Sequence, residues 1–338
     1  MSDPDKTFSD KKLIFFYEER IVLYIMAYST NIISESRCQE LYGKYGPSVL
    51  FFAKADINGI CVELQTANRD HMEMWNDNFY SPSDMVRSHA RVICVTDPAE
   101  DMRVDFDPAS FTAFLYNFDY YGWVKSIALG IAGYILEAAH GIYSVHGAAV
   151  NFDGTGVALI APSKTGKTTQ SWGLLRDSTS QLISDDWFFV TFGQGRPLIR
   201  GSEKNCYIDA DIGDVWEQYK PLVKNVNFDN KGRGIANLRW VAGRTSVVPT
   251  ASLKYVILLK RDQNDPDVCR ELSMHDALDY LVSNDFCNPH QIVRDDFRLQ
   301  LRKNFFTRLF TSCKVFVVNT TRPAKETQEI IRGILGGA

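Results

Sequence analysis

One segment of this chain combines an apolar run, a turn of small residues and a lysine-threonine pair at the start of an expected helix. In "ALIAPSKTGKTTQSWGLL", residues 158–175, Ala161 is followed after four residues by Gly166, Lys167 and Thr168. A P-loop has the pattern G-x-x-x-x-G-K-[ST] between a strand and a helix, because backbone N–H groups and the helix N-terminus must point at phosphate oxygens. Alanine keeps the small size needed at the first position. The segment therefore predicts a phosphate-binding loop of the Walker A type.

The chemistry of such a loop gives each polar group a role. Lys167 is expected to bring positive charge to the β- and γ-phosphates of ATP, and Thr168 to offer its hydroxyl to Mg²⁺. The residues expected to bind the nucleotide are Ser163, Lys164, Thr165, Gly166, Lys167, Thr168 and Thr169. Pro162 has no N–H to donate. Lys164 stands where related loops usually have glycine, either as a second phosphate contact or as the cause of a distorted loop.

Two adjacent acids follow the loop in the next expected strand. The stretch "ISDDWFFV" holds Asp185 and Asp186 within an apolar run. Consecutive strand residues face opposite sides of a sheet, and a buried carboxylate without a cation is costly. A solvated strand end is the simpler alternative, but "WFFV" continues the run after the pair. We therefore expect a functional pair that brings an acid to the metal ion of a phosphate site.

A histidine precedes the strand that leads into the loop. His146 lies in "SVHGAAV", between small and β-branched residues. By itself, a histidine in such surroundings is more often a hydrogen-bonded core side chain than a catalytic one. The residue pattern alone therefore favours a structural role for His146.

The elements that would position these residues alternate between strands and helices. A hairpin of strands 143–152 and 157–161, joined by "DGTG", is expected to lead into the loop, with a helix at 167–176 and a strand at 181–192. The tail repeats strand, helix, strand, helix in "SLKYVILLKRD", "SMHDALDYLVSN", "CKVFVVNT" and "AKETQEIIRGIL". This alternation predicts an α/β fold, and the hairpins predict that its sheet is mixed.

The N-terminal part is less regular. Residues 90–98 are typical of a strand and residues 111–139 of one or two helices interrupted at "YYG", whereas 13–30 fits a helix as well as a strand. We expect an N-terminal α+β region at 1–110 and a catalytic domain at 111–338.

Composition excludes several classes of protein. The chain has 338 residues, of which 45% are hydrophobic, and a net charge of −4, so a general basic field for nucleic acid is not expected. The seven cysteines are an odd number without a C-x-x-C pair, which favours reduced thiols and a cytoplasmic protein over disulfides or a zinc site. The longest apolar stretch, 126–145, contains Glu137 and His140 and begins beside Lys125, which favours a buried helix over a membrane span.

Read together, "HGAAV", "DGTGVALIAPSKTGKTT" and "LISDDWFFV" resemble the C-terminal catalytic domain of HPr kinase/phosphorylase. The "GKTT" also resembles phosphoenolpyruvate carboxykinase, whose nucleotide-binding core is similar. The likeness spans 143–191 and is closer to the diverse HPr kinase-like proteins than to the bacterial regulator. It implies a mixed-sheet P-loop kinase core, and it is compatible with a homo-oligomer.

The resemblance implies roles for the acids and the histidine. Asp185 would take the proton from an attacking hydroxyl, Asp186 would help to hold the metal, and His146 would lie near the transferring phosphoryl group. No segment matches the family's Glu-x-Arg-Gly motif, so HPr itself and phosphorolysis of phosphoserine are not expected. A basic loop either is a solvated face or closes over phosphate oxygens or a charged acceptor; its residues are Lys231, Arg233, Arg239 and Arg244.

The function expected from the sequence is an ATP-dependent kinase that uses Mg²⁺ and acts on a hydroxyl. The acceptor is either a small metabolite or a Ser/Thr of a peptide or protein. Two alternatives stay open at this point, a carboxykinase-like lyase and a non-catalytic nucleotide-binding sensor. Asp185 separates the kinase from the sensor, because a sensor needs no base there.

Overall fold

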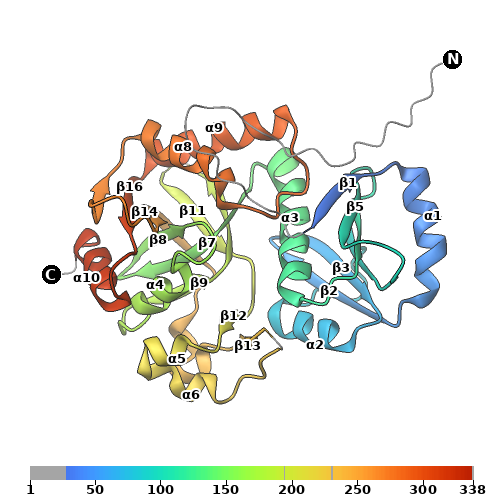
Figure 1. Ribbon diagram of the computed structural model, residues 1–338, viewed down its shortest axis with the longest axis horizontal. Coiled ribbons are helices and arrows are strands. Elements are labelled where there is room, and N and C mark those ends of the chain that lie inside the picture. Colours follow the sequence, from blue (N-terminus) through green and yellow to red (C-terminus); the bar gives the residue numbers. More distant parts are fainter. Residues whose placement is uncertain (1–27, 194, 230, 337–338) are drawn as a thin grey trace.

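The computed structural model describes residues 28–193, 195–229 and 231–336. Two mixed β-sheets lie on either side of one long helix, α3 (Tyr121–His140) (Figure 1). The protein therefore has a mixed α/β fold, as its alternating pattern predicts. The ambiguous segment 13–30 falls almost entirely outside the described residues.

The N-terminal sheet has six strands in the order β1-β5-β6-β4-β3-β2. Its elements are β1 (Ser29–Ile32), α1 (Glu35–Tyr45), β2 (Phe51–Ile57), β3 (Ile60–Thr66), α2 (Arg69–Asn78), β4 (Ala90–Val95), β5 (Arg103–Asp107) and β6 (Thr112–Tyr116). In β2 the side chains alternate, so that Ala53, Ala55 and Ile57 are buried in the core shared with α3, whereas Phe52 is exposed on the other face.

The prediction of helix from residue 111 onward is wrong for its first part. Residues 112–116 form β6, which pairs with β4 in parallel and with β5 in antiparallel orientation. All five residues of β6 are buried, so pairing between two neighbouring strands overrides their local helical spacing. The boundary expected at residue 110 falls between β5 and β6 of the same sheet, and the functional division into two regions stays a prediction.

Helix α3 contacts β3 and β4 of the N-terminal sheet and β7 (Tyr143–Phe152) of the second sheet. It ends at Gly141, whose φ of 61° is the left-handed conformation that glycine adopts without strain. Near this end Glu137 is buried and accepts a hydrogen bond from Arg302 at 2.7 Å and another from the Ser144 hydroxyl at 2.6 Å. This network explains the acid within an apolar helix and fixes the start of β7. Among the described residues, no helix is long and apolar enough to cross a membrane.

The second sheet has eight strands in the order β11-β10-β7-β8-β14-β16-β15, with β9 also paired to β7. Its remaining strands are β8 (Thr155–Ile160), β9 (Gln181–Ser184), β10 (Trp187–Phe192), β11 (Pro197–Gly201), β14 (Thr250–Lys260), β15 (Cys269–Glu271) and β16 (Lys314–Asn319). The expected β7–β8 hairpin is confirmed. Strand β11 also pairs with β14, which closes the pairings through β10, β7 and β8 into a ring.

Helices cover both faces of this sheet (Figure 1). The helices that follow β8 in the chain are α4 (Lys167–Leu174), α5 (Ile212–Val215), α6 (Lys220–Val223), α7 (Arg239–Ala242), α8 (Met274–Ser283), α9 (Asp296–Ser312) and α10 (Ala324–Ile334), together with a short ribbon of β12 (Cys206–Asp209) and β13 (Arg233–Ala236). In β8, Val157 and Leu159 share a core with α4 and α10, whereas Ala158 and Ile160 share one with α8 and α9. The strands and helices predicted for the tail are therefore confirmed.

Candidate functional site

The loop between β8 and α4 has a shape that depends on two left-handed residues. Lys164 has a φ of 65° and Gly166 a φ of 94°. Glycine adopts this conformation freely, whereas a lysine there is strained, which gives a physical reason why related loops have glycine at the position of Lys164. The buried Thr165 donates its hydroxyl to the Pro162 carbonyl at 2.7 Å, and Thr320 donates to the Thr165 carbonyl at 2.8 Å. The first bond is local to the loop, and the second anchors the loop to the residue that directly follows β16 (Lys314–Asn319).

The expected nucleotide-binding residues occupy different environments. Ser163 and Lys164 are exposed at the tip of the loop, and the Thr165 side chain is turned into the protein. Lys167 and Thr168 are half-buried in the first turn of α4, where the helix N-terminus carries partial positive charge. The role of these residues in nucleotide binding stays a prediction.

Two of the predicted site residues, Lys167 and His146, contact a third, Asp186. Lys167 donates from Nζ to Asp186 Oδ1 at 2.7 Å, and His146 Nε2 lies 3.3 Å from the same oxygen. The Asp186 side chain is 26% exposed. Burial alone would raise its pKa, but the ammonium groups of Lys125 and Lys167 hold the pKa well below its usual range. Asp186 is therefore an anion at neutral pH, which is the form that a metal ion binds.

A contact with a backbone carbonyl places a proton on one ring nitrogen of His146. Its Nδ1 lies 2.5 Å from the carbonyl oxygen of Cys287, and because a carbonyl only accepts, Nδ1 carries the proton. The Nε2 atom lies 3.3 Å from Lys167 Nζ and 3.3 Å from Asp186 Oδ1, so the ring contacts both members of this ion pair. His146 is thus placed to orient the lysine of the loop.

The carbonyl that holds His146 belongs to a strained turn that the sequence analysis missed. Asp285, Phe286 and Cys287 have φ values of 49°, 52° and 54°, a left-handed run that non-glycine residues rarely adopt. The neighbouring His290 is half-buried beside His146, with ring centres 6.2 Å apart. Burial and the proximity of His146 lower the pKa of His290 to about 3, so its ring is neutral. Without a glycine in "NDFC", the local sequence gives no signal for this turn.

The strand expected over 181–192 is interrupted at the acid pair. Strands β9 and β10 both pair with β7, and Asp185 and Asp186 lie in the break between them. The Gly147 N–H still donates to the Asp186 carbonyl at 2.8 Å, so the chain stays beside β7 through the break. An irregularity of this kind redirects side chains beside a site. An uninterrupted strand would place the two acids on opposite faces.

Asp185 is the least satisfied polar group of the site. Its side chain is buried at 4% exposure, and neither carboxyl oxygen has a hydrogen-bond partner among the described residues. Burial first, and then the negative charges of Asp186 and Glu203, raise its pKa to about 7. A carboxyl with free oxygens and a pKa near neutrality has the properties of a general base.

Lys125 is a site residue that the sequence analysis did not single out. It lies on α3 at 1% exposure and donates from Nζ to Asp186 Oδ2 and to Glu203 Oε1, both at 2.9 Å. Burial opposes its charge, but Asp186 and Glu203 together raise the pKa of Lys125 above its usual range. In the sequence, Lys125 is only a single lysine at the edge of the apolar stretch 126–145. This position does not show which side chains the lysine contacts.

The four basic residues at 231–244 do not form one cluster. Arg233 pairs with Asp209 at 2.7 Å, Lys231 lies 3.7 Å from Asp119, and Arg239 donates to the Lys204 carbonyl at 3.0 Å. Arg244 is exposed. Arg239 lines a small crevice beside Asp185 together with Glu203 and Cys206. Closure of all four residues over a phosphate finds no support in these contacts.

The metal-binding residues predicted from the sequence are Thr168 and Asp186. Asp186 contacts Lys167, the residue directly before Thr168, so the hydroxyl and the carboxylate belong to the same small region. Within the part of the chain that the structure describes, no three or more His, Cys, Asp or Glu side chains are grouped as a metal site. Mg²⁺ in nucleotide sites is commonly held by only one or two protein groups together with the phosphates, and these two residues match that donor chemistry.

Comparison with known proteins gives limited information. No family model matches the chain, and no curated protein sequence matches it. Among solved structures, the Hpr(Ser) kinase/phosphatase from Coxiella burnetii is similar at 15% sequence identity, over 57% of this chain and 93% of that chain, with a TM-score of 0.32. A superposition of this quality does not establish a shared fold, so the functional argument depends on the site itself.

Proposed function

We propose that the protein is an ATP-dependent kinase that transfers the γ-phosphoryl group to a hydroxyl of a small metabolite or of a Ser/Thr in a peptide or protein. The observation that supports this most is the contact of the loop lysine Lys167 with Asp186, next to the buried and unpartnered Asp185. A phosphate-binding cation, a metal-binding carboxylate and a free base are the groups that phosphoryl transfer requires. In this proposal the second sheet with α4 is a P-loop core of the HPr kinase/phosphoenolpyruvate carboxykinase type.

The residues of the loop fit a nucleotide with Mg²⁺. Lys167 supplies charge to the β- and γ-phosphates, the N-terminus of α4 supplies backbone N–H groups, and Thr168 with Asp186 would hold the metal ion. When bound, Mg²⁺ supplies positive charge that offsets the charge of the phosphates. His146 contacts both Lys167 and Asp186 through its Nε2 atom and would help to position this pair.

The proposed reaction uses Asp185 as the base. As the acceptor oxygen forms its bond to the γ-phosphorus, Asp185 takes the hydroxyl proton, and the bond from phosphorus to the bridging oxygen breaks so that ADP leaves with the electron pair. Both Asp185 oxygens are buried and have no hydrogen-bond partner among the described residues, so either one would accept the proton of an acceptor hydroxyl that enters beside it. A buried carboxyl without a hydrogen-bond partner lowers the stability of the fold. A kinase has a functional reason to keep such a group as its base, and a nucleotide sensor has none.

The proposal is tested by following label from γ-labelled MgATP into a cell extract separated by size, with Lys167→Ala as the blank. We expect enzyme-dependent label in one fraction. Label in the small fraction identifies a metabolite kinase, and label in the large fraction identifies a protein or peptide kinase. ATP binding without any enzyme-dependent label would contradict the kinase and favour a nucleotide-binding sensor.

The rate of transfer should rise with pH up to neutrality and level off above it. Asp185 accepts a proton only when it is deprotonated, and its pKa is raised to about 7 by burial, Asp186 and Glu203. Positive charge from Mg²⁺ at Asp186 would move the midpoint below this value but would not change the direction. The measurement is kcat/KM against pH for the wild-type protein. A rate that stays constant from well below to well above neutrality would show that Asp185 is not the base.

A further inference from the structure

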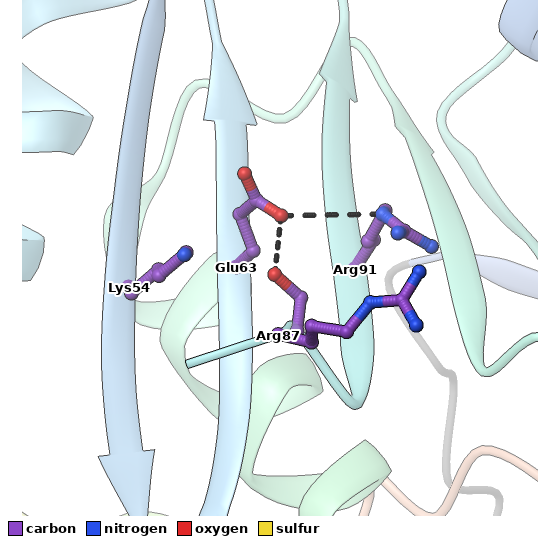
Figure 2. A pocket seen from close by; sticks show the side chains of 5 residues that line it. Lys54, Glu63, Arg87 and Arg91 are labelled. Atoms are coloured by element: carbon purple, nitrogen blue, oxygen red, sulfur yellow. Dashed lines mark hydrogen bonds and ion pairs between the residues drawn. The ribbon is translucent and has the colours of Figure 1, made fainter. Parts of the chain in front are cut away.

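A separate pocket lies on the N-terminal sheet, on the face that does not pack against α3. It has a volume of about 430 Å³ and is lined by Lys54, Glu63, Arg87, Ser88 and Arg91 (Figure 2). Lys54 of β2 pairs in register with Glu63 of β3, which pairs in register with Arg91 of β4. Because side chains directly opposite each other across strands share a face, these three lie side by side.

The pocket is positively charged within an acidic protein. Three cationic side chains surround one carboxylate, whereas the whole chain has a net charge of −4. The Glu63 carboxylate has two partners. Its Oε2 atom lies 3.9 Å from Arg91 Nε and accepts a hydrogen bond from the Ser88 hydroxyl at 2.5 Å. Arg87 is exposed and has no hydrogen bond or ion pair with any residue in the described ranges. The local excess is therefore two positive charges.

The loop that carries Arg87 and Ser88 is held against the sheet. Lys54 donates from Nζ to the carbonyl oxygens of Asp84 and Val86, both at 2.8 Å. This leaves two guanidinium groups to bind a ligand, that of Arg87, which has no partner among the described residues, and that of Arg91, whose one ion pair, with Glu63, is long at 3.9 Å. Figure 2 shows both on the same side of the Glu63 carboxylate. Neighbouring like charges repel, and an anion that accepts from both removes the repulsion.

We propose that this pocket binds a small molecule through a phosphate monoester held by Arg87 and Arg91. A phosphate monoester carries a charge of about −1.5 to −2 at neutral pH, which matches the local excess, whereas a single carboxylate neutralises half of it. An arginine guanidinium can donate two parallel hydrogen bonds to two oxygens of one phosphate group. The volume lies within the range of small-ligand pockets, about 300–1,000 Å³. The site is distinct from the P-loop, and its existence does not depend on the proposed kinase activity.

The test is equilibrium binding of labelled inorganic phosphate to the full-length Lys167→Ala variant, in which the loop cation is absent. We expect one saturable site per chain. When Arg87→Ala or Arg91→Ala is introduced into this variant, the affinity of the site for phosphate should fall about tenfold or more, because each substitution removes charge-assisted hydrogen bonds. Arg69→Ala is the matched control, since Arg69 is an exposed arginine of the same region that pairs with Glu73 at 2.9 Å. This control should bind phosphate like its parent.

Three results would overturn the proposal. One is the absence of saturable binding, and another is binding that both substitutions leave unchanged. The third is equal competition by acetate at constant ionic strength, which would show that the pocket does not select a doubly charged group. Arg87 and Arg91 have exposed or half-buried side chains, so thermal unfolding of the variants should match that of the parent and exclude misfolding as the cause of lost binding.

Discussion

Asp185→Asn is expected to lower the rate of phosphoryl transfer by about 10²–10⁴-fold, the usual contribution of a general base, while ATP affinity stays unchanged. The buried Asp185 carboxyl has no hydrogen-bond partner among the described residues, so its replacement by a neutral amide of the same shape breaks no bond. The contact between Lys167 and Asp186 is left in place. The loss should therefore appear in the chemical step.

The measurement combines single-turnover transfer from γ-labelled MgATP with equilibrium binding of ATP. Asp214→Asn is a suitable control, since Asp214 is an exposed acid on α5. Wild-type turnover by Asp185→Asn would rule out this residue as the base. Loss of ATP binding together with transfer would instead assign Asp185 to nucleotide binding.

Lys125→Met should lower the transfer rate by about 10²-fold, the effect expected when a catalytic group is misplaced by about 1 Å. It should also lower the free energy of unfolding by about 3–5 kcal/mol, because it leaves the buried Glu203 carboxylate without its cation. Lys125 binds Asp186 Oδ2 and Glu203 Oε1 at 2.9 Å each, and it reaches them from α3, outside the segment 143–191. We expect this lysine to position Asp186 rather than to contact the substrate.

Two further variants separate the effect on transfer from the effect on stability. Lys125→Arg keeps the charge and should recover part of both losses. Lys125→Met with Glu203→Gln removes one charge of each sign and should recover stability but not transfer, since Asp186 still lacks its partner at Oδ2. Denaturant unfolding and Mg²⁺-dependent transfer measure the two properties, with the exposed Lys224→Met as control. Wild-type transfer by the double variant would show that Lys125 only balances the charge of Glu203.

The predictions that the structure confirms depend on local patterns. The β7–β8 hairpin was predicted from two apolar runs around "DGTG", and the turn residues Asp153 and Gly154 both have positive φ. The strands and helices of the tail were predicted in the same way from periodicity and turn residues. The helix predicted from residue 111 failed at β6, because strand pairing with β4 and β5 decided its conformation.

The candidate site also has one part that follows from local sequence patterns and another that depends on contacts between distant segments. The sequence by itself predicts Lys167, Asp185 and Asp186 as site residues, because a loop pattern and an acid pair are properties of short segments, whereas only the family resemblance adds His146. Only the tertiary structure placed Lys125, Glu203 and the Cys287 carbonyl around them. These groups come from a helix before the motifs and from loops after them, and a hydrogen bond between distant segments leaves no periodic trace in either one. The same holds for the arginine pocket, whose members face one another only because the register of β2, β3 and β4 aligns them.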